Sequence, residues 1–245
     1  MERVFRQEQR QLQFASYIAI AIREIAPGRR HTGIFFRVDE NSDMEFMHLA
    51  WHCELQRDTS FSNKYCWVEP KIHKARLRQV AALCEDIASA NLPSQIPYAS
   101  GSPIDAFDAE TKAFLLGPTR AGLTCASFVL AVFERAQLRL VKYDGWPPPG
   151  TADIEFQQFV LDNLEGRPGV SDEHIRAVTN EIGTSIRYRP EQVAGAACVR
   201  GRGPVKYGYA ASLGNDIVRF LRGESCANEF RLSIWDRILN ALGLL

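Results

Sequence analysis

The chain has 245 residues, of which 46% are hydrophobic and 24% charged, a balance that suits one large globular domain or one domain with an appendage. Its 29 basic and 29 acidic residues cancel, so no net charge attracts nucleic acid or an anionic membrane. Six scattered cysteines without a Cys-x-x-Cys pair argue against a disulfide framework and favour a reducing compartment.

The N-terminal residues mix charges and lack the apolar core of a signal peptide. No apolar stretch is long enough to cross a bilayer. We therefore expect a cytoplasmic protein without a membrane span, although export by a leaderless route would leave no trace in the sequence.

Residues 4–26 have apolar side chains at helical spacing and predict an amphipathic helix that Pro27 and Gly28 end. The segments 29–38 and 44–51 are rich in β-forming residues and flank a polar turn, a pattern typical of a β-hairpin. Residues 65–68 are a candidate third strand.

An apolar stripe predicts a helix over residues 71–92, and the prolines of 93–103 predict a loop. Asp108 is expected to cap a short helix that ends at Leu116. A further helix is expected from Cys125 to about Gln137, followed by a possible strand over 138–143.

The proline- and glycine-rich segment 144–150 is the best candidate for a linker or rigid turn. Beyond it the sequence favours helices over 153–165, 171–183, 190–198, 209–222 and 228–243. We therefore predict an α+β fold in which a small antiparallel sheet of four to six strands packs on the cysteine-bearing helix. Residues 1–150 would form the catalytic unit, with a helical insertion at about 71–116. Residues 151–245 would form a helical extension that shapes the cleft or binds a protein partner.

The cysteine-bearing helix has one apolar face, and Cys125 lies on that face in the first turn. The residues that share the face are Phe128, Val129, Val132 and Phe133. Thr124 precedes the helix as a candidate N-cap. Free backbone N–H groups and the helix dipole favour the thiolate at this position, whereas a small buried core cysteine is the alternative interpretation.

Two histidines in the predicted hairpin supply the groups that a cysteine nucleophile requires. A base within about 3 Å takes the thiol proton, and a third polar group orients that base. His31 lies at the start of the first strand and His48 within the second, so the two rings meet if the strand register allows it.

The stretches His31-Thr-Gly-Ile-Phe-Phe36 and Phe46-Met-His-Leu-Ala50, separated by a polar turn, resemble the opening hairpin of the circularly permuted papain-like hydrolases. That superfamily joins NlpC-type peptidoglycan amidases with lecithin–retinol acyltransferase-like enzymes. The resemblance implies that Cys125 is the nucleophile, His31 the general base and His48 its orienting partner. It covers about thirty residues and rests on the order of the three side chains. Thr124-Cys-Ala-Ser127 stands where the acyltransferase branch has Asn-Cys-Glu-His, which argues against that branch.

His52 is an alternative to His48 as the third catalytic residue, and Glu54 and Asp58 are weaker contenders for that position. A metal site is a further alternative for the His and Cys residues nearby, which are His48, His52, Cys53 and Cys66. A basic run interleaved with tyrosines is best interpreted as a solvated surface; it contains Arg187, Arg189, Arg200, Arg202 and Lys206.

These observations predict a thiol-dependent hydrolase or acyltransferase that acts on an amide bond in a peptide, a peptidoglycan stem peptide or a protein. Such chemistry requires no metal or organic cofactor. The alternative is a non-catalytic interaction module of the same fold, in which Cys125 is a buried core residue.

Overall fold

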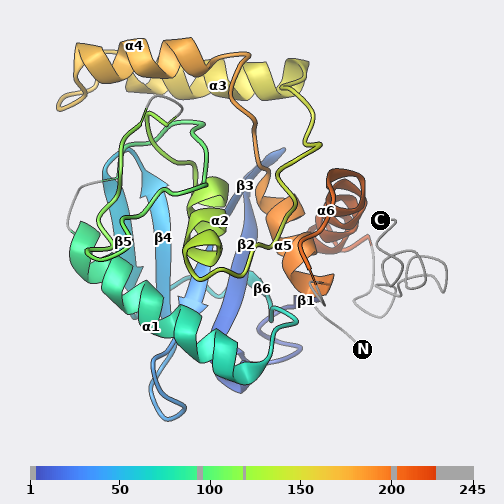
Figure 1. Ribbon diagram of the computed structural model, residues 1–245. Coiled ribbons are helices and arrows are strands. Elements are labelled where there is room, and N and C mark those ends of the chain that lie inside the picture. Colours follow the sequence, from blue (N-terminus) through green and yellow to red (C-terminus); the bar gives the residue numbers. More distant parts are fainter. Residues whose placement is uncertain (1–3, 93–95, 118–119, 200–202, 225–245) are drawn as a thin grey trace.

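The computed structural model describes residues 4–92, 96–117, 120–199 and 203–224, and it shows an α+β fold (Figure 1). Six strands form one sheet in the order β1-β6-β2-β3-β4-β5, with every neighbouring pair antiparallel. The strands are β1 (Val4–Phe5), β2 (Ile18–Ala26), β3 (Arg29–Phe36), β4 (Glu45–Trp51), β5 (Glu54–Asp58) and β6 (Cys66–Val68).

Six α-helices lie in the described residues, and they occupy one face and one end of the sheet. They are α1 (Lys74–Asn91), α2 (Cys125–Arg135), α3 (Thr151–Leu164), α4 (Asp172–Glu181), α5 (Pro190–Val199) and α6 (Tyr207–Leu221). Helices α1, α2 and α5 pack on the sheet, and α6 packs on α5. Helices α3 and α4 lie side by side across one end of the sheet (Figure 1). None of the helices in these described segments is both long and apolar enough to cross a membrane.

The two faces of the sheet carry different apolar clusters. The helix-covered face contributes Ile18, Ile20 and Ile22 from β2 to the large core. The opposite face contributes Ala19 and Ala21 to a smaller aromatic cluster built around Phe35, Phe46 and Trp67. Alternate residues of β2 are therefore buried on both sides.

The predicted N-terminal helix over 4–26 is wrong, because this segment forms β1, a short 3₁₀ turn (Leu12–Phe14) and β2. The five residues from Ile18 to Ile22 are all fully buried in the middle of the sheet. A strand that is apolar on both faces shows no alternation, so its isoleucines at spacings of four imitate a helical stripe.

The predicted hairpin is confirmed by the antiparallel pairing of β3 with β4, in which Ile34 faces Met47 and Phe35 faces Phe46. The third predicted strand is also confirmed as β6, although it pairs with β1 and β2 rather than with the hairpin's outer edge. The helices predicted over 71–92, from Cys125, and over 153–165, 171–183, 190–198 and 209–222 correspond to α1 to α6. The segment 228–243 lies outside the described residues.

Two smaller predictions are wrong. Residues 108–116 form a turn instead of a helix, because the Asp108 carboxylate accepts hydrogen bonds from the N–H groups of Glu110 and Thr111 and Phe107 bridges Phe114. Residues 138–143 form no strand and contribute only an isolated bridge from Val141 to Val205. The division at residue 150 stays a prediction, but α5 from beyond it is buried against β2 and β3.

Candidate functional site

The rings of His31 and His48 meet on the aromatic face of the hairpin. His31 Nε2 lies 2.8 Å from His48 Nδ1, and the ring planes cross at 79°. Gly33 makes this possible, since a Cβ at that position would lie 2.6 Å from the Cβ of His48. Any larger residue there would force β4 away from β3 and separate the two histidines.

Asp58 continues the hydrogen-bonded chain from the next strand. The β4–β5 register places Asp58 opposite Phe46 and Gln56 opposite His48, so the carboxylate lies one pleat from the imidazole. Asp58 Oδ2 lies 3.3 Å from His48 Nε2. Asp58 therefore lies behind His48. The sequence suggested Asp58 only as a weaker contender for the third catalytic position.

This chain of contacts orders the protons on both rings. A carboxylate can only accept, so His48 Nε2 carries its proton and His48 Nδ1 is an acceptor. His31 then donates from Nε2, which leaves the Nδ1 of His31 with a free lone pair. The three residues thus hold His31 in the tautomer of a base.

Both imidazoles are neutral at neutral pH. Burial, assisted by the nearby His48 and Arg23, lowers the pKa of His31 from 6.5 to about 3. Burial also lowers the pKa of His48, and this effect exceeds the opposing effect of its contact with Asp58. The site is therefore built around uncharged rings.

Cys125 is the first residue of α2, as predicted, and a capping box fixes that end of the helix. The Ser127 N–H donates to Thr124 Oγ1 at 3.1 Å, and the Thr124 N–H donates to Ser127 Oγ at 2.8 Å. This reciprocal pair holds the helix start, and with it the sulfur, in one place.

The thiol of Cys125 meets several hydrogen-bonding groups but stays protonated. Burial raises the pKa of the thiol above its ordinary value, and this outweighs the opposing effect of the Thr32 N–H, the Tyr98 hydroxyl and the Ala126 N–H. The backbone donors at the start of α2 favour the thiolate, as expected, but burial has the larger effect on the pKa of the thiol. Cys125 is only 4% exposed, and desolvation disfavours its charged form more than the backbone donors favour it.

Tyr98 was not predicted as part of the site. Its hydroxyl hydrogen-bonds both the thiol and the backbone N–H of Cys125. The segment that carries it runs beside residue 123, where the Leu123 N–H donates to Pro97 O at 3.0 Å. Gly122 allows this approach, because a Cβ there would lie 2.2 Å from Pro97 O. Nothing in the local sequence of Tyr98 signals this contact, which depends on the packing of two loops.

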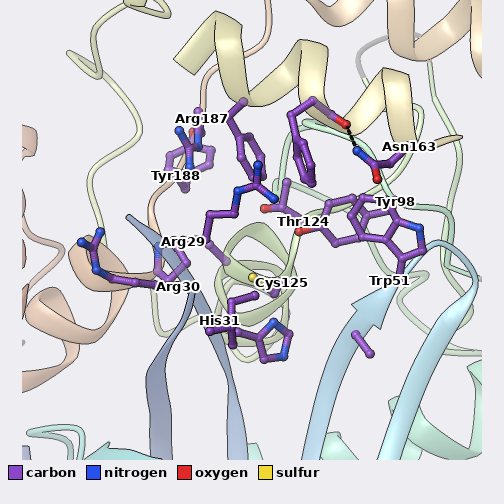
Figure 2. A pocket seen from close by; sticks show the side chains of 16 residues that line it. Arg29, Arg30, His31, Trp51, Tyr98, Thr124, Cys125, Asn163, Arg187 and Tyr188 are labelled. Atoms are coloured by element: carbon purple, nitrogen blue, oxygen red, sulfur yellow. Dashed lines mark hydrogen bonds between the residues drawn. The ribbon is translucent and has the colours of Figure 1, made fainter. Parts of the chain in front are cut away.

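His31 and Cys125 line one cavity of about 280 Å³, while His48 and Asp58 support His31 from behind. In Figure 2, Cys125 and His31 lie in the lower part of the view, below the side chains of Arg187, Tyr98 and Thr124. Its walls come from β3, β4, α3 and the connection between α4 and α5. The wall residues include Trp51, Tyr98, Phe156, Phe159, Arg187 and Tyr188.

The competing sequence interpretations fare differently. His52 contacts His174 and the backbone of Tyr98 instead of His31. Within the described segments no three His, Cys, Asp or Glu side chains gather as metal ligands would.

The solvated-surface interpretation of the basic run is wrong for Arg187 and Tyr188, whose side chains are largely buried in the cavity wall. Arg200 and Arg202 lie outside the described residues.

Comparisons of the chain with protein-family models, with curated proteins and with solved structures all give no match. The site must therefore be interpreted from its own residues.

Proposed function

We propose that the protein is a thiol-dependent hydrolase or acyltransferase that acts on amide bonds in peptides or proteins. Cys125 is the nucleophile, His31 the general base, and His48 the residue that orients His31. The observation that carries this proposal is the continuous chain Asp58–His48–His31, which ends at the cavity that also contains the Cys125 sulfur. The same order of residue types supports a permuted papain-like arrangement as the finer description of the fold.

Because His31 and the Cys125 thiol are both uncharged in the free protein, the reaction would begin with a proton transfer between them. His31 Nδ1 takes the proton from the thiol as the sulfur attacks the substrate carbonyl, so no standing thiolate is required. A carbon–sulfur bond forms, and the carbonyl π electrons move onto oxygen. The Cys125 N–H and the Tyr98 hydroxyl, which hydrogen-bond each other in the free protein, are the donors available to that oxyanion.

The second half of the reaction returns the proton. His31, now protonated, donates to the leaving amine as the carbon–nitrogen bond breaks, which leaves an acyl group on Cys125. Water or another nucleophile then attacks this thioester, and His31 again acts as the base. His48 and Asp58 stabilise the transient imidazolium through their hydrogen bonds.

The raised pKa of the Cys125 thiol is the observation that favours the second candidate function, a non-catalytic interaction module with a buried cysteine. A buried structural thiol is inert, whereas a nucleophile reacts at a rate that depends on its base. The two candidates therefore differ in a measurable property of one side chain.

Reaction with p-nitrophenyl acetate separates the two candidates. Wild-type protein is expected to release a rapid burst of one equivalent of p-nitrophenolate and to carry an acetyl group on Cys125 by mass spectrometry. Cys125→Ala removes the burst, while Cys53→Ser, which changes a cysteine outside the cavity, keeps it. A protein without a burst, or a burst that survives in Cys125→Ala, would contradict the proposal.

A further inference from the structure

The cavity above Cys125 has an uneven charge. Three arginines line it, and no aspartate or glutamate does so among the described residues. The three are Arg29 and Arg30 from β3 and Arg187 from the α4–α5 connection. The chain as a whole is neutral, so this excess of positive charge is local.

The three guanidinium groups are balanced to different degrees. Arg30 forms ion pairs with Glu191 at 3.1 Å and with Glu24 at 3.5 Å. Arg187 lies 3.5 Å from Asp153, a carboxylate that it shares with Arg189 at 2.8 Å. Asp153 thus serves two arginines, and Glu191, the partner of Arg30, is the other carboxylate whose charge acts on Arg187.

Arg29 forms no ion pair with any acidic residue in the described part of the chain. Its guanidinium lies 3.7 Å from the centroid of the Phe159 ring on α3. Arg187 lies at the same distance over Phe156, one turn earlier on the same helix. Figure 2 shows Arg29 extending from its strand toward α3, above Cys125 in this view.

Stacking on a ring fixes the plane of a guanidinium and leaves its in-plane N–H groups available. Those N–H groups match the two oxygens of a carboxylate. The apolar walls supplied by Ile25 and Trp51 suit the carbon chain that carries such a group. A cavity of about 280 Å³ admits one short side chain rather than an extended polymer.

We propose that the cavity selects a substrate with a carboxylate close to the carbonyl that Cys125 attacks, and that Arg29 is its main partner. Arg187 is the second partner. This inference rests on the proposed function, because it assigns the substrate class of the same site. It predicts preference for an acidic residue, or for a terminal carboxylate, beside the bond that is cleaved.

The matched alkylating reagents iodoacetate and iodoacetamide test this preference. In both reactions the Cys125 sulfur forms a bond to carbon, the carbon–iodine bond breaks, iodide leaves, and the thiol proton passes to His31 or buffer. The reagents differ in one carboxylate, so the ratio of their rates reports charge recognition independently of how reactive the thiol is. The rates are followed at low salt by mass spectrometry of the Cys125 peptide, with the neutral N-acetylcysteine amide as the reference thiol.

The iodoacetate-to-iodoacetamide ratio at Cys125 is expected to exceed the reference ratio about tenfold, and to fall as salt is added. Arg29→Gln is expected to remove most of this excess, Arg29→Lys to keep part of it, and Arg29→Glu to bring the ratio below the reference. Arg29 is exposed, so these substitutions leave the fold intact. Arg139→Gln removes an exposed arginine that does not line the cavity and is expected to leave the ratio unchanged.

The two proposals fail in distinguishable ways. If iodoacetamide labels Cys125 at a rate that depends on His31 but the ratio equals the reference and ignores Arg29, the carboxylate preference is wrong while the proposed function stands. If neither reagent labels Cys125 in the folded protein, the nucleophile assignment fails and the substrate inference fails with it.

Discussion

Two pairs of histidines lie close to the Cys125 site, and their surroundings give them different properties. His31 and His48 have ring centroids 4.9 Å apart, and His52 and His174 have centroids 4.5 Å apart. The first pair is joined by a direct ring-to-ring hydrogen bond and continues to Asp58. The second pair bonds the peptide backbone of Tyr98, whose N–H donates to His52 Nδ1 at 3.4 Å and whose carbonyl accepts from His174 Nε2 at 3.2 Å.

Residue type and spacing therefore do not define the role of a histidine in this protein. Asp58 at the end of the first pair orders the protons so that an acceptor nitrogen remains on His31, in the cavity wall. In the second pair the bonding nitrogens are occupied by backbone groups, which positions Tyr98 rather than moving a proton. Under the proposed function, we expect the first pair to move a proton and the second to support the Tyr98 loop.

Removing one ring from each pair gives the sharpest test of this difference. His31→Ala is expected to slow acetylation of Cys125 by p-nitrophenyl acetate about 100-fold, because the proposed general base is lost. His52→Ala is expected to change the same rate less than about threefold. Equal losses in the two variants would show that the pairs do not differ in function.

Asp58→Asn tests whether the proton order of the first pair matters. An amide can present N–H to His48 Nε2, which would reverse both hydrogen bonds and place a proton on His31 Nδ1. We expect an acetylation rate about tenfold lower; the effect is moderate because the Asp58 side chain is 40% exposed and water can replace it. Glu54→Gln alters the neighbouring acidic contender, which pairs with Arg167, and is the matched control. An unchanged rate in Asp58→Asn would show that Asp58 does not determine which nitrogens of His48 and His31 carry a proton.

Acid destabilisation extends the comparison to both pairs. Burial lowers the pKa of His31 from 6.5 to about 3 and that of His52 to about 4. Below pH 6.5 these histidines are therefore protonated in the unfolded chain while they stay neutral in the folded protein. The free energy of unfolding decreases as pH falls toward these values. Each histidine contributes a slope of at most about 1.4 kcal/mol per pH unit in this window.

Urea unfolding between pH 7 and pH 4 measures this slope in wild type, His31→Ala and His52→Ala. Each variant is expected to lose stability less steeply than wild type on acidification. The difference between curves removes contributions from other groups, such as Glu181, whose pKa burial raises to about 7 and which acts in the opposite direction. Parallel curves for all three proteins would show that the buried rings do not resist protonation.

The smallest expected effect concerns the outer ring of the second pair. His174→Ala removes the donor to the Tyr98 carbonyl, and we expect a free energy of unfolding lower by about 1 kcal/mol. The acetylation rate of Cys125 is expected to stay within about threefold of wild type. A large loss of rate with unchanged stability would instead give His174 a part in the reaction.

Much of the local structure follows from the sequence. The hairpin, the helix α2 and the Thr124 cap depend on residues a few positions apart, and all three are confirmed. The prediction of an N-terminal helix is wrong because β2 is buried on both faces, so its apolar and polar residues do not alternate. In that segment the pattern of apolar residues alone does not distinguish a central strand from a buried helix.

The candidate site was predictable only in part. His31, His48 and Cys125 were named from their order and their elements, and the structure places His31 against His48 and in one cavity with Cys125. Asp58 reaches His48 through the β4–β5 register, and Tyr98 reaches Cys125 through the close contact at Gly122. Both contacts join segments whose relative position no local pattern specifies.

The sequence by itself determined that a cysteine begins a helix and that two histidines occupy one hairpin, since backbone propensity and capping act over a few residues. Only the tertiary structure decided the protonation of these groups. The helix N-terminus favours a thiolate, yet burial among residues distant in the sequence keeps the thiol protonated and His31 neutral. Desolvation depends on everything packed around an atom, so it becomes known only when the chain is folded.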